Sequence, residues 1–154
     1  PHYQKNAGTD RYLLLDDDGG LIPMGGTDLM ALPAHFLHSV GNFSFYDPTS
    51  RILLSGDVGS SLVPSGAPYE PVEDFGPHSK SMLGFHRRYM ASRRVARLWV
   101  AMVRELDPAW IVPQHGLPMR GAAIGEFLSW LENLDCGSDL LGPADYRIPR
   151  RAVA

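Results

Sequence analysis

The chain has 154 residues, the ordinary length of one folded domain, and 44% of them are hydrophobic, which excludes a disordered or fibrous protein. Fourteen Lys and Arg against seventeen Asp and Glu give a net charge of −3, so no overall basic field exists to hold a nucleic acid or an anionic membrane. The single cysteine, Cys136, excludes an internal disulfide, and no apolar stretch approaches the roughly 20 residues of a membrane span. We therefore expect a cytoplasmic chain with a single domain over residues 1–154.

Residues 1–60 are predicted to be rich in strands. Short apolar segments alternate there with Gly, Asp and Pro turns, and we expect strands at 11–16, 21–24, 27–32, 42–46 and 51–55. The sequence Asp-Pro-Thr-Ser at 47–50 has Pro at the second turn position, which is typical of a type I turn. A strand–turn–strand unit is therefore expected around it.

Residues 78–141 are predicted to form helices with one strand between them. Apolar residues spaced by three and four from Val95 to Leu106 indicate an amphipathic helix over 93–106, with Ser92 as its N-cap and Pro108 beyond its end. We expect an earlier helical piece at 81–90, a short strand at 109–112, a second amphipathic helix from about 124 that ends near Gly137, and an irregular tail from 142 onward. The fold class is therefore α/β, with helices covering a sheet.

Three polar side chains occur where a strand meets a loop, and each is followed closely by glycine: His38, Asp57 and His115. Strand ends aimed at one edge of a sheet are where α/β folds collect ligands. Two imidazoles and one carboxylate suit zinc, iron or manganese. Taken singly, each histidine is more often a hydrogen-bonded structural residue, and Asp57 alone could cap a loop; the set of three favours a metal site.

The motifs around these residues are similar to a known family. The segments Leu-Pro-Ala-His-Phe-Leu-His-Ser-Val-Gly-Asn-Phe, Tyr-Asp-Pro, Ile-Leu-Leu-Ser-Gly-Asp and Ile-Val-Pro-Gln-His-Gly occupy 32–43, 46–48, 52–57 and 111–116. Together they resemble the second half of a metallo-β-lactamase-fold domain, in the oxygen-binding di-iron branch related to flavodiiron proteins. The resemblance covers about residues 32–141. It implies part of an αββα sandwich, a mixed sheet with covering helices, that lacks the N-terminal half.

The resemblance also implies roles for the three residues. His38 would bind one metal, Asp57 would bridge two, and His115 would bind the other, with iron as the expected metal (two per completed site) and zinc as the alternative. Oxygen or nitric oxide would be the small ligand. A redox partner protein and a homodimer in the full-length form are further expectations of the resemblance.

One feature of the family is missing from the sequence. The remaining ligands of the family come from an earlier His-x-Glu-x-Asp-His or His-x-His-x-Asp-His motif, and no such motif occurs in the 154 residues. Because a divalent metal normally needs four or more ligands, the three residues provide half a site. We expect the chain to be truncated at its N-terminus or completed by another polypeptide.

Three hypotheses about function follow. The favoured one is a di-iron domain that binds or reduces oxygen or nitric oxide, either as a sensor or as a reductase fed by a separate partner. The second is a dinuclear zinc hydrolase of the same fold, which metal analysis would distinguish. The third is a metal-free interaction unit or truncated fragment, which the missing motif supports.

The remaining histidines and the cysteine are weaker candidates. His35, three residues before His38, is expected to be structural or to orient a ligand. The resemblance implies that the segment with His78 and His86 lies over the metal pocket, so either residue could line its entrance. Cys136 has no basic neighbour and is interpreted as a small buried residue.

Overall fold

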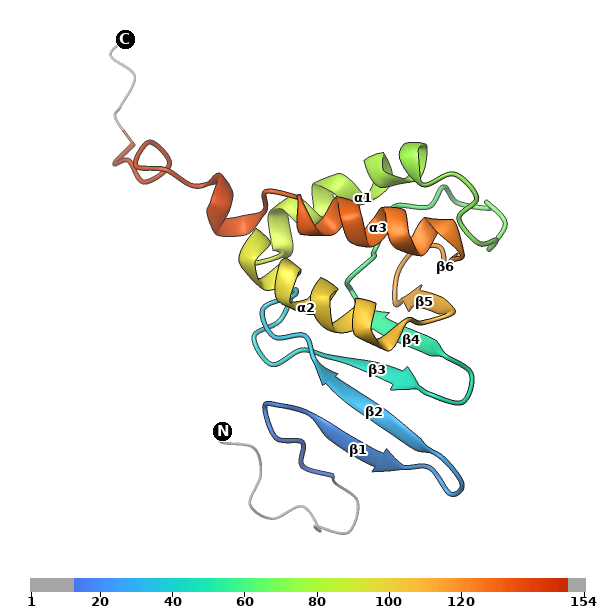
Figure 1. Cartoon of the computed structure of the whole chain (residues 1–154). Coiled ribbons are helices and arrows are strands. Elements are labelled where there is room, and N and C mark those ends of the chain that lie inside the picture. The colour runs from blue at the N-terminus through green and yellow to red at the C-terminus, as the bar shows by residue number, and fades with distance from the viewer. Residues whose placement is uncertain (1–12, 150–154) are drawn as a thin grey trace.

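The computed structural model describes residues 13–149, which form a six-stranded mixed sheet with three helices against one of its faces (Figure 1). The strands lie in chain order across the sheet: β1 Gly20–Pro23, β2 Asp28–Pro33, β3 Phe43–Asp47, β4 Ile52–Gly56, β5 Trp110–Pro113 and β6 Met119–Arg120. β4 and β5 pair in parallel, and the other neighbouring strands pair antiparallel. The α/β fold with a mixed sheet and covering helices is therefore confirmed.

The helices lie between β4 and β5 and after β6. α1 spans Phe75–Tyr89, α2 spans Arg93–Leu106, α3 spans Ala122–Glu132, and a 3₁₀ turn, η2, spans Gly137–Leu140. The two consecutive helices α1 and α2 form the crossover that the parallel pairing of β4 and β5 requires. The predicted limits of α2 are confirmed, and the Ser92 hydroxyl accepts a hydrogen bond from the Val95 N–H at its start.

The core lies between the helices and the sheet. The buried side of α2 includes Trp99, whose indole N–H donates to the hydroxyl of Ser44 on β3 at 3.1 Å. Both residues are buried, so each satisfies the polar group of the other inside an apolar layer. Residues alternate along a strand, and Ser44 and Tyr46 therefore face the helices while Phe43 and Phe45 face the other side of the sheet.

The predicted turn at 47–50 is confirmed, and Asp47 accepts hydrogen bonds from the backbone of Thr49 and Ser50. Other predicted elements need correction. The predicted strand at 11–16 is wrong for its described part: residues 13–16 hold only an isolated bridge from Asp16 to Gly19, and Leu14 is 92% exposed. Residues 11 and 12 lie outside the described residues. The helix predicted to end near Gly137 ends at Glu132, and the two-residue strand β6 was not predicted.

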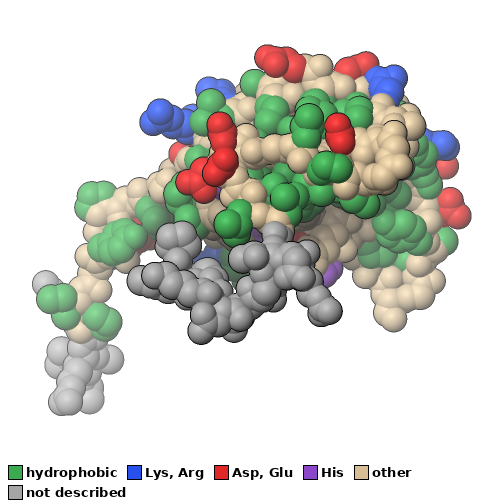
Figure 2. All heavy atoms as spheres, turned by 90° about the horizontal axis from the view of Figure 1, so that it is seen from below, with side chains coloured by type: hydrophobic (Ala, Val, Ile, Leu, Met, Phe, Trp, Pro, Cys, Tyr) green, Lys and Arg blue, Asp and Glu red, His purple; other side chains and the backbone are tan. Residues whose placement is uncertain are grey.

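Large apolar side chains also occur at the surface. Leu21 and Met24 in the β1 region and Leu54 on β4 are exposed. Figure 2, which views the molecule from below, shows many hydrophobic side chains with charged ones scattered among them. Within residues 13–149, no helix has the length and apolar character that crossing a bilayer requires.

Candidate metal centre

Sheet topology brings the ends of three strands to one edge. β2 and β3 are antiparallel, as are β3 and β4, while β4 and β5 are parallel, so β2, β4 and β5 all run in the same direction. Their carboxyl ends therefore meet at the same edge of the sheet. His38 follows the end of β2, Asp57 directly follows β4, and His115 follows β5. This topology brings together three residues that are far apart in the sequence.

The three side chains converge on the Asp57 carboxylate. His38 Nε2 lies 4.0 Å from Asp57 Oδ2, and His115 Nε2 lies 3.9 Å from Asp57 Oδ1. The side chains are 40% (His38), 25% (Asp57) and 68% (His115) exposed, so solvent and small molecules reach the site. Each histidine faces a different oxygen of the carboxylate, and both separations are too long for hydrogen bonds.

These separations suit a metal-binding role. Metal–nitrogen and metal–oxygen bonds in proteins are each about 2 Å long, so a gap of about 4 Å between an imidazole nitrogen and a carboxylate oxygen has room for a metal ion. Within residues 13–149, no three His, Cys, Asp or Glu side chains are grouped to hold a single metal. Each oxygen of the Asp57 carboxylate has one imidazole beside it, so each of two metal positions would have one imidazole nitrogen and one carboxylate oxygen as ligands.

The loop that carries His38 is held by backbone hydrogen bonds and by α1. His38 has a φ of 62°, the left-handed region that non-glycine residues rarely adopt. The Phe36 N–H donates to the Ser39 carbonyl at 2.8 Å, which closes the loop around this residue. The imidazole packs against the rings of Phe85 and Tyr89 on α1, with centroids 5.5 Å and 5.1 Å away. Packing of this kind sustains the unfavourable backbone conformation of His38.

The loops that carry Asp57 and His115 are joined to each other. The Gln114 N–H donates to the Gly56 carbonyl at 2.7 Å, which extends the parallel pairing past the strand ends. The Ser61 N–H donates to the His115 carbonyl at 3.0 Å, and the Ser60 hydroxyl donates to Asp57 Oδ1 at 3.3 Å. These bonds fix the carboxylate relative to the His115 backbone.

A close backbone approach occurs directly after His115. Gly116 has a φ of 116°, and a Cβ built on it would lie 2.2 Å from the hydroxyl oxygen of Ser61. No side chain fits there without moving the loop from 57 to 61. Glycine at this position lets the two loops meet beside the site.

The prediction for His86 was wrong. It is fully buried on α1, and its ring nitrogens bond to the Met82 carbonyl and the Gly59 N–H, so it does not line an entrance. Burial lowers its pKa from 6.5 to about 4, against smaller opposing contributions from the Met82 carbonyl and the Asp57 charge. The role of His86 was not visible in the sequence, because both residues 59 and 86 had to be placed in space first.

The other weaker candidates lie in three different environments. His35 packs edge-on against Phe43 and bonds to the Asp17 carbonyl. His78 is half-buried on α1, and burial lowers its pKa. Cys136 is buried, as predicted, and burial raises the pKa of its thiol to about 11, which leaves it an unreactive thiol at neutral pH.

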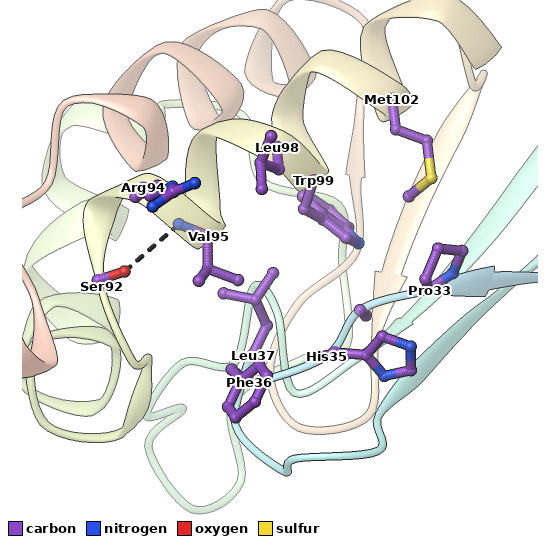
Figure 3. Close-up of a pocket in the computed structure, with 11 residues that line it drawn as sticks. Pro33, His35, Phe36, Leu37, Ser92, Arg94, Val95, Leu98, Trp99 and Met102 are labelled. Atoms are coloured by element: carbon purple, nitrogen blue, oxygen red, sulfur yellow. Dashed lines mark hydrogen bonds between the residues drawn. The ribbon is translucent and has the colours of Figure 1, made fainter. Parts of the chain in front are cut away.

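A separate cavity of about 580 Å³ lies between α2 and the segment after β2 (Figure 3). Its walls are mainly apolar, including Leu98, Trp99 and Met102. The polar groups at its rim are few, and the Ser92 hydroxyl among them is already engaged by the backbone of α2. None of the strand-end residues His38, Asp57 and His115 lines this cavity, so it is separate from the candidate metal site.

Comparison with solved structures finds the same fold in di-iron proteins. The chemotaxis sensor ODP, solved as a peroxy diiron species, is 41% identical over 85% of this chain and 55% of its own, with a TM-score of 0.79. The apo state of chemotaxis sensor ODP from T. denticola is 40% identical over 86% of this chain and 55% of its own, with a TM-score of 0.81. The flavodiiron protein from Giardia intestinalis is 22% identical over 78% of this chain and 29% of its own, with a TM-score of 0.61, and shows the fold alone.

The chain therefore spans about half the length of the ODP sensor chains that it resembles. A comparison with curated protein sequences gives no match. Residues 1–116 match the family described as "ODP family beta lactamase". On this match and on the strand-end geometry that agrees with it, the chain belongs to the ODP family, in the di-iron branch of the metallo-β-lactamase fold.

Proposed function

We propose that this chain supplies half of a dinuclear iron centre that binds oxygen or nitric oxide. The observation that carries the proposal is the placement of Asp57, whose two carboxylate oxygens face His38 and His115 separately. A carboxylate that bridges two ions holds them at the short separation that dinuclear sites use. His38 and His115 would each hold one ion, and Asp57 would set the distance between the two.

The donor chemistry suits iron. Neutral imidazole nitrogen and carboxylate oxygen are ligands that ferrous iron accepts, and a pair of ferrous ions supplies a site where one diatomic molecule can bind and be reduced. The chain's own residues keep this position open to solvent, because both histidines are well exposed. The remaining ligands would come from outside these 154 residues, from an upstream segment or a second polypeptide.

We favour a sensor over a reductase. The supporting observation is the 40–41% identity to chains solved as a chemotaxis sensor. A reductase would need a redox partner protein to deliver electrons, and a zinc hydrolase would need a different metal. A cytoplasmic location and a homodimer in the full-length form remain part of the proposal.

Anaerobic loading with ferrous iron tests the proposal. The chain would be loaded alone and together with the N-terminal half of the domain, in cis or as a separate polypeptide, and the bound iron would be measured by elemental analysis. We expect weak uptake by the chain alone and about two irons per completed complex. His38→Ala should lose chiefly one iron, whereas Asp57→Ala should lose both.

The optical spectrum separates the alternatives. Exposure of the iron-loaded complex to oxygen should produce a charge-transfer band in the near-ultraviolet or visible region. Preference for zinc, with a colourless protein and esterase activity, would support the hydrolase instead. Equal metal content in the wild type, His38→Ala and Asp57→Ala would leave the metal-free interaction hypothesis.

A further inference from the structure

We propose that His86 is a positioning residue that sets the place of the Asp57 carboxylate between the two histidines. It would act through the backbone of the loop that follows β4. The inference rests on the proposed function of Asp57 as a bridging ligand. The contact that would do this is the buried hydrogen bond from Gly59, in the loop after β4, to His86 on α1.

The hydrogen bonds of His86 define its form. Its Nδ1 lies 2.9 Å from the Met82 carbonyl, which can only accept, so the proton sits on Nδ1. Nε2 therefore has a free lone pair, and it accepts the Gly59 N–H at 3.0 Å. The ring is fully buried, with the rings of Trp130 and Phe85 at centroid distances of 5.2 Å and 5.5 Å. A neutral imidazole is thus held in one tautomer and one orientation.

The loop that receives this bond is a tight turn around Asp57. The Val58 N–H donates to the Ser55 carbonyl, and the Ser60 N–H donates to the carbonyl of Asp57 itself, at 3.2 Å and 3.1 Å. Gly59 lies within this turn at a φ of 104°, and a Cβ there would meet the Met119 methyl at 3.1 Å. A displacement of the Gly59 backbone therefore passes directly to residue 57, two positions earlier.

The helix that carries His86 also contacts the other side of the site. Phe85 and Tyr89 on α1 support the His38 ring, so one rigid helix fixes both His38 and the Asp57 loop. The His38–Asp57 separation of 4.0 Å is then determined by α1. Without the acceptor at His86, the buried Gly59 N–H would be unpaired, at a cost that favours a shifted loop.

Two substitutions separate positioning from packing. His86→Phe retains an aromatic ring and removes the acceptor, whereas His86→Gln places a carbonyl oxygen that can accept the Gly59 N–H. Ferrous iron would be titrated anaerobically into the completed complex of each variant. We expect iron affinity to fall roughly 10- to 100-fold in His86→Phe, as for other residues that orient metal ligands, and to be largely restored in His86→Gln.

NMR of the metal-free chain tests the same inference without depending on iron. A scalar coupling across the hydrogen bond between the Gly59 amide nitrogen and His86 Nε2 is expected in the wild type, and the side-chain carboxyl resonance of Asp57 should shift in His86→Phe. Absence of the coupling in the wild type overturns the proposal, even if His86→Phe does not fold. An unchanged Asp57 resonance in a folded His86→Phe chain also overturns it. If the NMR results hold but the wild type and Asp57→Ala bind iron equally, the proposed function fails and the positioning role stands.

Discussion

His38 combines a candidate ligand side chain with an unfavourable backbone. Its φ of 62° places Cβ close to its own carbonyl oxygen, which costs a non-glycine residue about 1–2 kcal/mol. Packing of the imidazole against the rings of Phe85 and Tyr89 offsets part of this cost. Backbone strain of this kind clusters at functional positions, where function rather than stability fixes the residue type.

A pair of substitutions at this position isolates the backbone contribution. His38→Gly and His38→Ala both remove the imidazole, but only glycine adopts this φ without strain. We expect His38→Gly to be more stable to urea than His38→Ala by about 1 kcal/mol, while both lose the same share of bound iron. Equal stability of the two variants, or a more stable alanine variant, would show that the loop does not impose this conformation.

Gly116 is the second position where a single residue fixes the site. Gly116→Ala should lower the free energy of unfolding by about 2 kcal/mol, because the new Cβ collides with Ser61 at a φ unsuited to alanine. Gly84→Ala is the matched control, since Gly84 lies in α1 with open space around its Cβ position. The control should gain about 0.5–1 kcal/mol in the same denaturation measurement. A Gly116→Ala chain as stable as the wild type would contradict the close approach of the two loops.

At the scale of elements, α1 is the support of the site, and its buried histidine makes it sensitive to acid. Burial lowers the folded-state pKa of His86 to about 4 from the usual 6.5. Between these values the unfolded chain binds a proton that the folded chain does not, so stability falls as pH falls. Above pH 6.5 both states are neutral at this residue, and the contribution is constant.

The pH dependence of unfolding should therefore differ between the wild type and His86→Gln. Between pH 7 and pH 4, protonation of His86 in the unfolded chain should lower the free energy of unfolding of the wild type by about 3 kcal/mol. The variant lacks this contribution. Urea denaturation at a series of pH values, compared between the two chains, measures this difference. Parallel pH profiles would show that His86 is not buried in its neutral form.

The elements themselves differed in how far the sequence could predict them. The limits of α2 were predictable because the apolar spacing, the Ser92 cap and Pro108 are all local signals. The strand predicted at 11–16 pairs with no other strand in its described part. An apolar segment becomes a strand only where a neighbouring strand pairs with it. On this side of the sheet, β2 pairs with β1 instead. β6 has two residues and no periodic signal, and its pairing with β5 comes from tertiary contact.

At the scale of the whole molecule, the convergence of His38, Asp57 and His115 at one sheet edge was predictable from the sequence. The strand ends, the glycines that follow them and the motif resemblance are all local features of the sequence. The two histidines converge on Asp57 because β2, β4 and β5 run in the same direction. The link from Gly59 to His86 was not predictable, since 27 residues separate the bonded pair. Buried polar contacts between distant residues depend on packing that single-sequence patterns do not encode.

The whole chain provides only part of the metal ligands that the proposed centre needs. It spans about half of the ODP sensor chains, and it contributes one imidazole on each side of one carboxylate. If the missing donors lie in the other half of the domain, metal binding and assembly are coupled. The completed complex should then unfold at a higher temperature with ferrous iron than without it, whereas the chain alone should gain little. An equal gain in the chain alone would indicate a full ligand set within these residues.

The central claim is that Asp57 lies between two metal ions. Anomalous diffraction at the iron edge, from crystals of the iron-loaded completed complex, tests it most directly. We predict two iron peaks, one between Asp57 and His38 and the other between Asp57 and His115, with both peaks lost in Asp57→Ala. A single peak, or iron bound away from the Asp57 carboxylate, would contradict the account.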